Sequence, residues 1–278
     1  IHQEHLRNSA PSSAANQNSA ARIGFLRLCR YMPETLEDGW MDQCLNRLLE
    51  MYEGKIVGCP PYTNPDGSYG ESTSGYMDGT VNEMVEGMEM LRDMVGEDNE
   101  VYRYMVDEAY GKLINYMMDL CMPYGMSPAW GDGGRGGMKS FLSQQIKIFP
   151  NKEIEFLTSE GKGTGVVEPD HTSKLYSDKA IAFLKDGWLP NNLGAVINAD
   201  LGGSHAHADD LAVDVCAYGA YLLVDAGNDS YSPGSAMTKT VKKTLSHNTI
   251  ELTREPTKDE HGTITKTYSE DQVVASKS

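Results

Sequence analysis

The stretch LAVDVCAYGAYLLVD, residues 211–225, decides the fold of this chain. From Leu211 to Ala217, apolar side chains occupy every second position, which is the period of a β-strand with one buried face. Gly219-Ala220 suits a two-residue turn with glycine in its first position. Because residues 221–225 can return as the partner strand, the stretch predicts a β-hairpin.

The same period of two appears upstream, in residues 180–184 and 193–199. No helical pattern interrupts these segments, so we expect an antiparallel sheet. Residues 20–122 instead carry apolar side chains three and four positions apart, which is the spacing of amphipathic helices. Helices are expected within residues 41–52, 81–95 and 101–120, the second ended by Gly96 and the third by Pro123.

A glycine-rich segment, residues 131–137, separates the two halves. It lacks the Gly-Lys-Ser/Thr ending of a phosphate-binding loop, so we interpret it as a linker or cleft loop. The chain is therefore expected to be an α+β multidomain protein. Its expected parts are a helical domain (1–145), a linker or cleft loop (146–175) and an antiparallel β-sandwich (176–278) that continues past the last residue.

Composition excludes several kinds of partner. The net charge of −16 argues against nucleic acid, which binds clusters of Lys and Arg. No apolar run reaches the length of about 18 residues that a membrane span needs. The five cysteines include no Cys-x-x-Cys pair and are interpreted as small buried hydrophobic residues. An acidic ligand would need a local basic cleft, for which the candidates are Arg22, Arg135, Lys139, Lys242 and Lys243.

Metal-ligating residue types gather in the C-terminal half. His205-Ala-His207 is followed by Asp225 and then by His247. Imidazole nitrogens and a carboxylate are suitable ligands for zinc. The spacing therefore predicts a metal site.

The hairpin limits how such a site can form. With a turn at Gly219-Ala220, Tyr218 would pair with Tyr221 and Asp225 would lie opposite Asp214. His207 precedes Asp214 by seven residues, an extended length of roughly 23 Å. A shared site thus requires the loop of residues 202–209 to fold back over the hairpin, which Gly202 and Gly203 would permit.

Three short sequence motifs resemble those of the heparinase II/III family of polysaccharide lyases, which includes oligoalginate lyases. They are GGSHAHAD (202–209), LLVDAG (222–227) and SHNT (246–249), in the family's order and at its approximate spacing. Residues 176–178 and 183–188 fit the first strands of the family's sandwich. The helical half resembles the end of its α/α toroid. Family members are longer at both ends, so we expect this chain to be a central fragment.

The resemblance implies roles for individual residues. A structural zinc would be held by His207, Asp225 and His247. The catalytic residues would be His205 and Tyr76, with Tyr69 as the alternative tyrosine, and Asn16, or else Asn18, would neutralise the substrate carboxylate. Substrate binding is expected from Gln17, Arg135 and Tyr231, although Tyr231 also suits a turn. Gln17 stands where several members have His, and Lys242 and Lys243 stand where an Arg is often found.

These roles imply a secreted or periplasmic enzyme that cleaves an acidic, uronic-acid-containing glycan by β-elimination. Two other functions compete with it. One is a non-catalytic glycan-binding protein of the same fold. The other is a metallo-β-lactamase-type hydrolase, suggested by His205-x-His207-x-Asp209, although that family has His where Asp210 stands. The sequence carries no signal for an oligomeric state.

Overall fold

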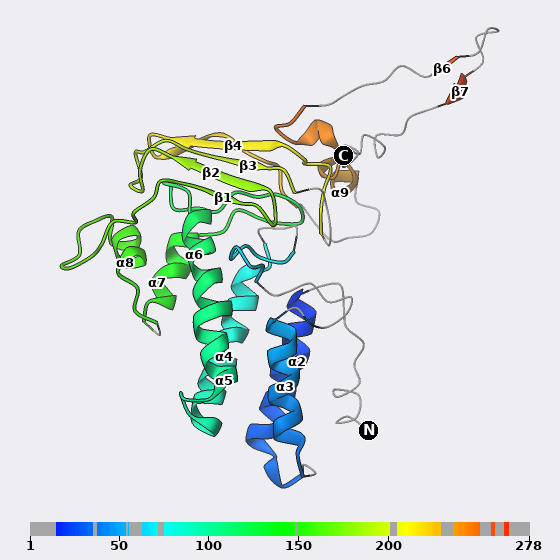
Figure 1. Cartoon of the computed structure of the whole chain (residues 1–278). Helices are drawn as coiled ribbons and strands as arrows, with labels where there is room; N and C mark the ends of the chain where they lie inside the picture. Colours follow the sequence, from blue (N-terminus) through cyan, green and yellow to red (C-terminus); the bar gives the residue numbers. More distant parts are fainter. Residues whose placement is uncertain are drawn as a thin grey trace.

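A computed structural model describes most of the chain: residues 15–35, 38–53, 55, 63–71, 75–147, 149–200, 205–228, 236–250, 257–258 and 264–266. Tyr231 and the Gly202-Gly203 pair lie outside these residues, as do the side chains of Asn16 and Asn18. Figure 1 shows the described part as a layer of helices beneath a twisted sheet.

The helical layer contains the three helices predicted from the spacing of apolar residues. Along the described residues the helices are α2 (Ala15–Tyr31), η1 (Pro33–Thr35), α3 (Trp40–Tyr52), α4 (Met77–Val95), α5 (Glu100–Arg103), the π-helix η2 (Tyr104–Tyr110), α6 (Gly111–Leu120), α7 (Met138–Gln145), α8 (Lys152–Ser159), α9 (Ala236–Val241) and η3 (Thr244–Ser246). Of these, α9 lies at the end of the sheet and not in the layer beneath it (Figure 1). Gly96, with φ of 82°, ends α4 as expected. The predicted helix 101–120 forms as the run α5, η2 and α6, begun by Asn99, whose side chain caps the first turn.

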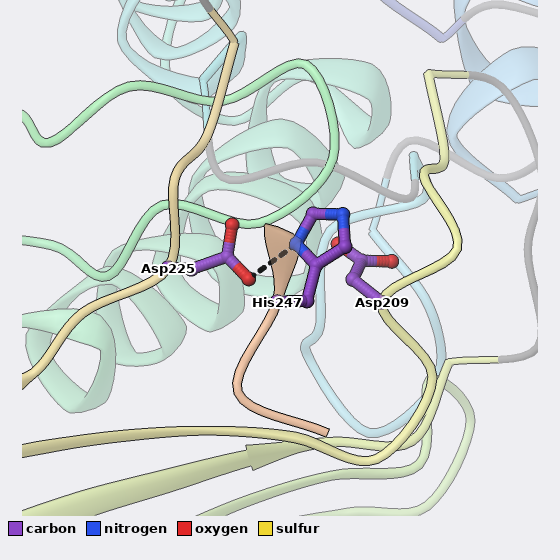
Figure 2. A group of neighbouring side chains, drawn as sticks. All are labelled: Asp209, Asp225 and His247. Atoms are coloured by element: carbon purple, nitrogen blue, oxygen red, sulfur yellow. Dashed lines mark hydrogen bonds and ion pairs between the residues drawn. The ribbon is translucent and has the colours of Figure 1, made fainter. Parts of the chain in front are cut away.

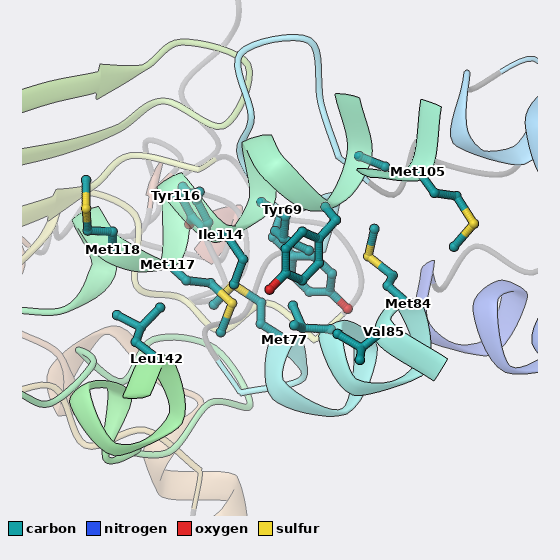
Figure 3. Packing of buried hydrophobic residues seen from close by; sticks show 14 of the residues in the cluster. Tyr69, Met77, Met84, Val85, Met105, Ile114, Tyr116, Met117, Met118 and Leu142 are labelled. Atoms are coloured by element: carbon teal, nitrogen blue, oxygen red, sulfur yellow. The ribbon is translucent and has the colours of Figure 1, made fainter. Parts of the chain in front are cut away.

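Methionines fill much of the core between these helices. Met84, Met88 and Met105 are fully buried, and Figure 3 shows the cluster between α4 and α6. Unbranched methionine side chains pack well in such irregular spaces. The four cysteines that the structure describes are also buried and free, as predicted. Within the described part of the chain, no helix has the length and apolar character needed to cross a bilayer.

The sheet is an antiparallel meander of five strands in chain order. The strands are β1 (Ser173–Tyr176), β2 (Ile181–Lys185), β3 (Gly194–Asn198), β4 (Ala212–Ala217) and β5 (Ala220–Leu223), and a separate pair is formed by β6 (Thr257–Lys258) and β7 (Ile264–Lys266). One face carries the buried side chains of Phe183, Val196 and Cys216. The ring of Tyr116, from α6, packs edge-on against Phe183, so this face covers the helices.

The predicted hairpin is present, but its turn was placed one residue too late. Ala217 pairs with Ala220, so the turn residues are Tyr218 and Gly219, with φ of 53° and 76°. Two positive φ values give the turn the twist that antiparallel strands require. The expected pairing of Tyr218 with Tyr221 was therefore wrong. Further along the hairpin, the pairing of β4 with β5 shifts register between Cys216 and Val215.

The segment 146–175, expected to be a linker or cleft loop, contains helix α8. The side chain of Asn151 accepts hydrogen bonds from the amides of Glu153 and Ile154 and so begins this helix. Glu160, with φ of 55°, ends it. The cap was not recognised in the sequence because the helix is only two turns long.

A buried lysine joins the end of α6 to β2. Lys185 Nζ donates to the carbonyl oxygens of Asp119 (2.6 Å) and Cys121 (3.1 Å). It also lies 3.8 Å from the centre of the Trp188 ring. Burial lowers the pKa of Lys185 to about 8, because the charged form loses its hydration.

Replacing Lys185 with Met should remove a pH-dependent part of the stability. The unfolded chain holds the lysine proton up to a pKa of about 10.4, whereas the folded chain releases it near 8. Between these values the unfolded state binds more protons, so the free energy of unfolding rises with pH. Relative to Lys185→Met, the wild type should gain up to about 3 kcal/mol across this window. Denaturant unfolding of both proteins at several pH values measures this gain, and a pH-independent difference would contradict it.

Candidate active site and metal centre

Residues 205–209 bring Asp209 close to Asp225, and residues 202–204 of the loop that the predicted metal site required to fold back lie outside the described residues. His205 and Leu211 both have left-handed backbones, with φ of 68° and 62°. The carbonyl of His205 accepts a hydrogen bond from the amide of Asp132 (2.8 Å), and the amide of Ala208 donates to the carbonyl of Lys242 (3.2 Å). Non-glycine residues adopt this backbone at a cost, so these contacts stabilise the fold of the loop.

Two carboxylates and one imidazole lie close together where this loop ends. Asp209, Asp225 and His247 are buried, and each offers a ligand atom within 4.8 Å of the others. Figure 2 shows Asp225 and Asp209 on either side of the His247 ring. Asp225 Oδ2 lies 2.7 Å from His247 Nδ1. The amide of Asp225 donates to Asp214 Oδ1 (2.6 Å), so the two residues are in contact, although Val215 pairs with Leu223 and the strand register is one residue away from the predicted pairing of Asp214 with Asp225.

His207, a predicted ligand, lies beside this group. Its ring centroid lies 5.6 Å from that of His247. His207 Nδ1 and His247 Nε2 are buried and have no hydrogen-bond partner among the residues that the structure describes. Buried polar atoms of this kind need a partner, and a metal ion is one. Two imidazoles and two carboxylates fit zinc, so the residues present suit the predicted metal.

Asp209 was not among the predicted ligands, although it ends the motif GGSHAHAD. Its carboxylate accepts a hydrogen bond from the amide of Gly131 (2.7 Å). Burial raises the pKa of Asp209. In His247, burial is the largest single influence and opposes the charged form, but the hydrogen bond to Asp225, the charges of Asp225 and Asp209 and a backbone hydrogen bond together outweigh it and raise the pKa. A nearby cation would favour the ligand forms of both residues.

Tyr76 and His205 meet at the edge of the helical layer. Their ring centroids are 4.5 Å apart. Tyr76 stands immediately before α4, which positions its ring. The alternative, Tyr69, packs in the core, where its hydroxyl lies 3.1 Å from Thr80 Oγ1 and burial raises its pKa. Tyr76 is therefore the tyrosine that the structure brings to His205.

Asp132 is a site residue that the sequence did not reveal. Its Oδ2 lies 3.0 Å from His205 Nδ1, and its Oδ1 lies 2.9 Å from His207 Nε2. Lys242 Nζ pairs with the same Oδ1 at 2.8 Å. Burial alone would raise the pKa of Asp132, but hydrogen bonds from Lys242 and both histidines hold it at about 2. Within a glycine-rich loop, nothing in the sequence distinguished this carboxylate.

The predicted substrate-binding residues have different positions. Arg135 is exposed and lines a cavity of about 240 Å³ together with Gly75, the neighbour of Tyr76, and Asp78. Gln17 is exposed on α2. The structure therefore brings Arg135 to a cavity that Gly75, the residue before Tyr76, also lines.

Close glycine contacts hold the loop that contains Asp132. A Cβ atom on Gly227 would lie 2.5 Å from the carbonyl oxygen of Gly133, and one on Gly75 would lie 2.8 Å from Gly133 Cα. Gly227 also has a φ of 63°. Gly133 thus packs between the segment after β5 and the segment before α4.

Gly227→Ala should therefore displace Asp132 and disturb the metal site. The added methyl meets backbone, which cannot move aside as a flexible side chain can, and the positive φ adds strain. We expect a loss of stability of about 1–3 kcal/mol. Thermal unfolding and metal content would be compared with Gly134→Ala, a matched control in the same loop whose Cβ meets nothing within 4 Å. Equal behaviour of the two variants would show that the packing is not restrictive.

Comparison with known proteins confirms the family resemblance. Residues 193–265, which contain all three motifs, match the family model described as Heparinase II/III-like, C-terminal. No curated protein sequence matches the chain. The fold is similar to that of a heparinase III structure, with a TM-score of 0.72 and 20% identity over 90% of this chain and 39% of the other.

Two further structures give the same result. Another heparinase III has a TM-score of 0.71 and 17% identity, covering 89% of this chain and 40% of its own. The heparan sulfate lyase HepC from Pedobacter heparinus has a TM-score of 0.65 and 19% identity, covering 88% and 38%. The chain thus spans about two fifths of the length of these proteins, and at this identity the likeness shows the fold.

Proposed function

We propose that this chain carries catalytic residues of a polysaccharide lyase that cleaves uronic-acid glycans by β-elimination. The observation that carries the proposal is the contact between Tyr76, from the helical layer, and His205, from the loop before β4. The match to the heparinase II/III-like family model and the fold shared with heparinase III structures support this reaction class over a metallo-hydrolase.

The reaction requires a base that removes one proton from the substrate and an acid that donates one to the leaving oxygen. β-Elimination removes the proton at C5 of a uronic acid and expels the glycosidic oxygen at C4, which leaves a C4–C5 double bond. Tyr76 or His205 would take the C5 proton, and Tyr76 would return one to the leaving oxygen. Tyrosine has an ordinary pKa of about 10, so it needs a polar or cationic neighbour to act as a base, and His205 stands against its ring.

Charge on the substrate carboxylate must also be stabilised. Negative charge moves onto this group in the transition state, where a hydrogen-bond donor is most effective. We assign this role to Asn16 on α2, and we assign binding of the acidic glycan to Arg135, which lines a cavity together with Gly75. Heparan sulfate is the first substrate to test, because the similar structures include a heparan sulfate lyase.

The metal in this proposal is structural. His207, Asp225 and His247 would hold zinc, with Asp209 as a further ligand within reach. A bound zinc would pin the loop that carries His205, two residues from His207. The chain's own residues would carry out the proton transfers.

The larger fold and the location are part of the same proposal. We infer that the helices form the end of an α/α toroid and that the sheet is one layer of a β-sandwich. Leu175, Leu184 and Leu223, on the sheet face opposite the helices, are 64%, 46% and 45% exposed, and an apolar face of this kind suits a second sheet. As a glycan-degrading enzyme, the protein would act in the periplasm or outside the cell.

The test is the absorbance of the conjugated uronate product during incubation of the full-length protein with a panel of acidic polysaccharides. An increase with one of them would establish elimination and identify the substrate class. Binding to a glycan without any increase, by the folded and metal-loaded protein, would instead support the non-catalytic glycan-binding protein.

A further inference from the structure

Both ring nitrogens of His205 face carboxylates. Nδ1 lies 3.0 Å from Asp132 Oδ2, and Nε2 lies 3.9 Å from Glu71 Oε2. The two acids come from separate segments, since Glu71 precedes α4 and Asp132 belongs to the glycine-rich loop before α7. Two independent segments therefore meet at one imidazole.

Neither carboxylate is accessible to a glycan. The Glu71 side chain is fully buried and the Asp132 side chain is 5% exposed, whereas the His205 side chain is 23% exposed. A substrate can reach the histidine but not the acids beside it. Their role must therefore be exerted through His205.

The geometry restricts the imidazole in two ways. A half-turn of the ring about its Cβ–Cγ bond would replace both nitrogens with carbon atoms and separate both carboxylates from their partners. The Tyr76 ring covers one face, with centroids 4.5 Å apart. Acid–base groups lose efficiency when misplaced by as little as about 1 Å, so this restraint bears directly on the reaction.

Asp132 contacts a second histidine in addition to His205. Asp132 also contacts His207, at 2.9 Å from Nε2, and this leaves the buried Nδ1 of His207 to face the metal site. A carboxylate that orients a metal-ligating imidazole is a common arrangement in metalloproteins. Glu71 faces His205, with Oε2 at 3.9 Å from Nε2.

We propose that Glu71 and Asp132 are positioning residues that clamp the His205 imidazole from both edges, and that Asp132 extends this restraint to the metal ligand His207. The effect on catalysis rests on the proposed lyase function, whereas the effects on the imidazole and on metal binding do not. Glu71, which precedes α4, thus affects the reaction by positioning His205 and does not contact the substrate.

The experiment compares Glu71→Gln and Asp132→Asn in the full-length protein. Both substitutions keep the shape of the side chain and remove its charge. Glu71→Gln should lower kcat by about 10- to 100-fold with little change in KM and with wild-type zinc content. Asp132→Asn should lower kcat and also weaken zinc binding by about 10- to 100-fold. Glu71→Asp, which restores a carboxylate, should recover part of the lost kcat and serves as the second variant if Glu71→Gln does not fold.

A readout without substrate separates this inference from the proposed function. The imidazole ¹⁵N resonances of His205 should shift in both variants but not in Asp119→Asn, a matched control whose buried carboxylate contacts Tyr176 and His171 instead. Unchanged His205 resonances in Glu71→Gln would overturn the clamp even if the protein is a lyase. Zinc binding by Asp132→Asn equal to that of the control would overturn the link to His207. Shifted resonances in a protein with no lyase activity would support the clamp and reject the proposed function.

Discussion

Tyr76→Phe should lower kcat for β-elimination by about 10²- to 10⁴-fold, which is the usual contribution of a positioned acid–base group. The substitution removes only the hydroxyl and keeps the ring that stands 4.5 Å from His205, so the packing of the site should survive. KM should change little, because the hydroxyl acts on the C5 proton and the leaving oxygen rather than on the bound glycan. The rate of formation of the unsaturated product measures the effect.

Tyr69→Phe is the matched control for this experiment. Tyr69 is buried and its hydroxyl contacts Thr80, so its loss should cost about 1 kcal/mol of stability and leave the rate unchanged. His205→Ala should be as inactive as Tyr76→Phe if the two residues work as a pair. Wild-type rates in both Tyr76→Phe and His205→Ala would remove these residues from the mechanism.

Asp225→Ala should abolish zinc binding and destabilise the protein. The change removes a buried carboxylate from the group that includes Asp209, and it leaves His247 Nδ1 without the oxygen that now lies 2.7 Å away. Losing one member of a buried charged pair costs about 3–5 kcal/mol, and the loss of a structural metal adds to this. Metal analysis of the purified protein and thermal unfolding with and without a chelator measure both effects.

Asp178→Asn provides the comparison for the metal experiment. Asp178 Oδ2 accepts a hydrogen bond from the amide of Asp66 (3.0 Å), which an asparagine oxygen can replace, so this variant should keep its zinc. A chelator should lower the unfolding temperature of the control and of the wild type but have no effect on Asp225→Ala. One zinc per chain in Asp225→Ala would exclude Asp225 as a required ligand.

Local features of the fold were predictable because they depend on residues close in sequence. The spacing of apolar residues predicted α3, α4 and the run from α5 to α6, and Gly96 ended α4 as expected. The hairpin was predicted as well, but not its turn, because Tyr218 adopts a left-handed backbone that a tyrosine rarely takes. The short helix α8 was missed, since its eight residues show too little periodicity.

The sequence by itself determined three of the helices, the hairpin and the three family motifs, and it singled out His205, His207, Asp225 and His247, because periodicity and short motifs are local properties of a chain. Only the tertiary structure revealed Asp132 and Glu71 as neighbours of His205 and Asp209 as a neighbour of Asp225. Asp132 and His205 are 73 positions apart. Their contact depends on a left-handed residue, on close glycine packing and on the hydrogen bond between the Asp132 amide and the His205 carbonyl. Such contacts arise from the folding of distant segments onto one another, and no local pattern encodes them.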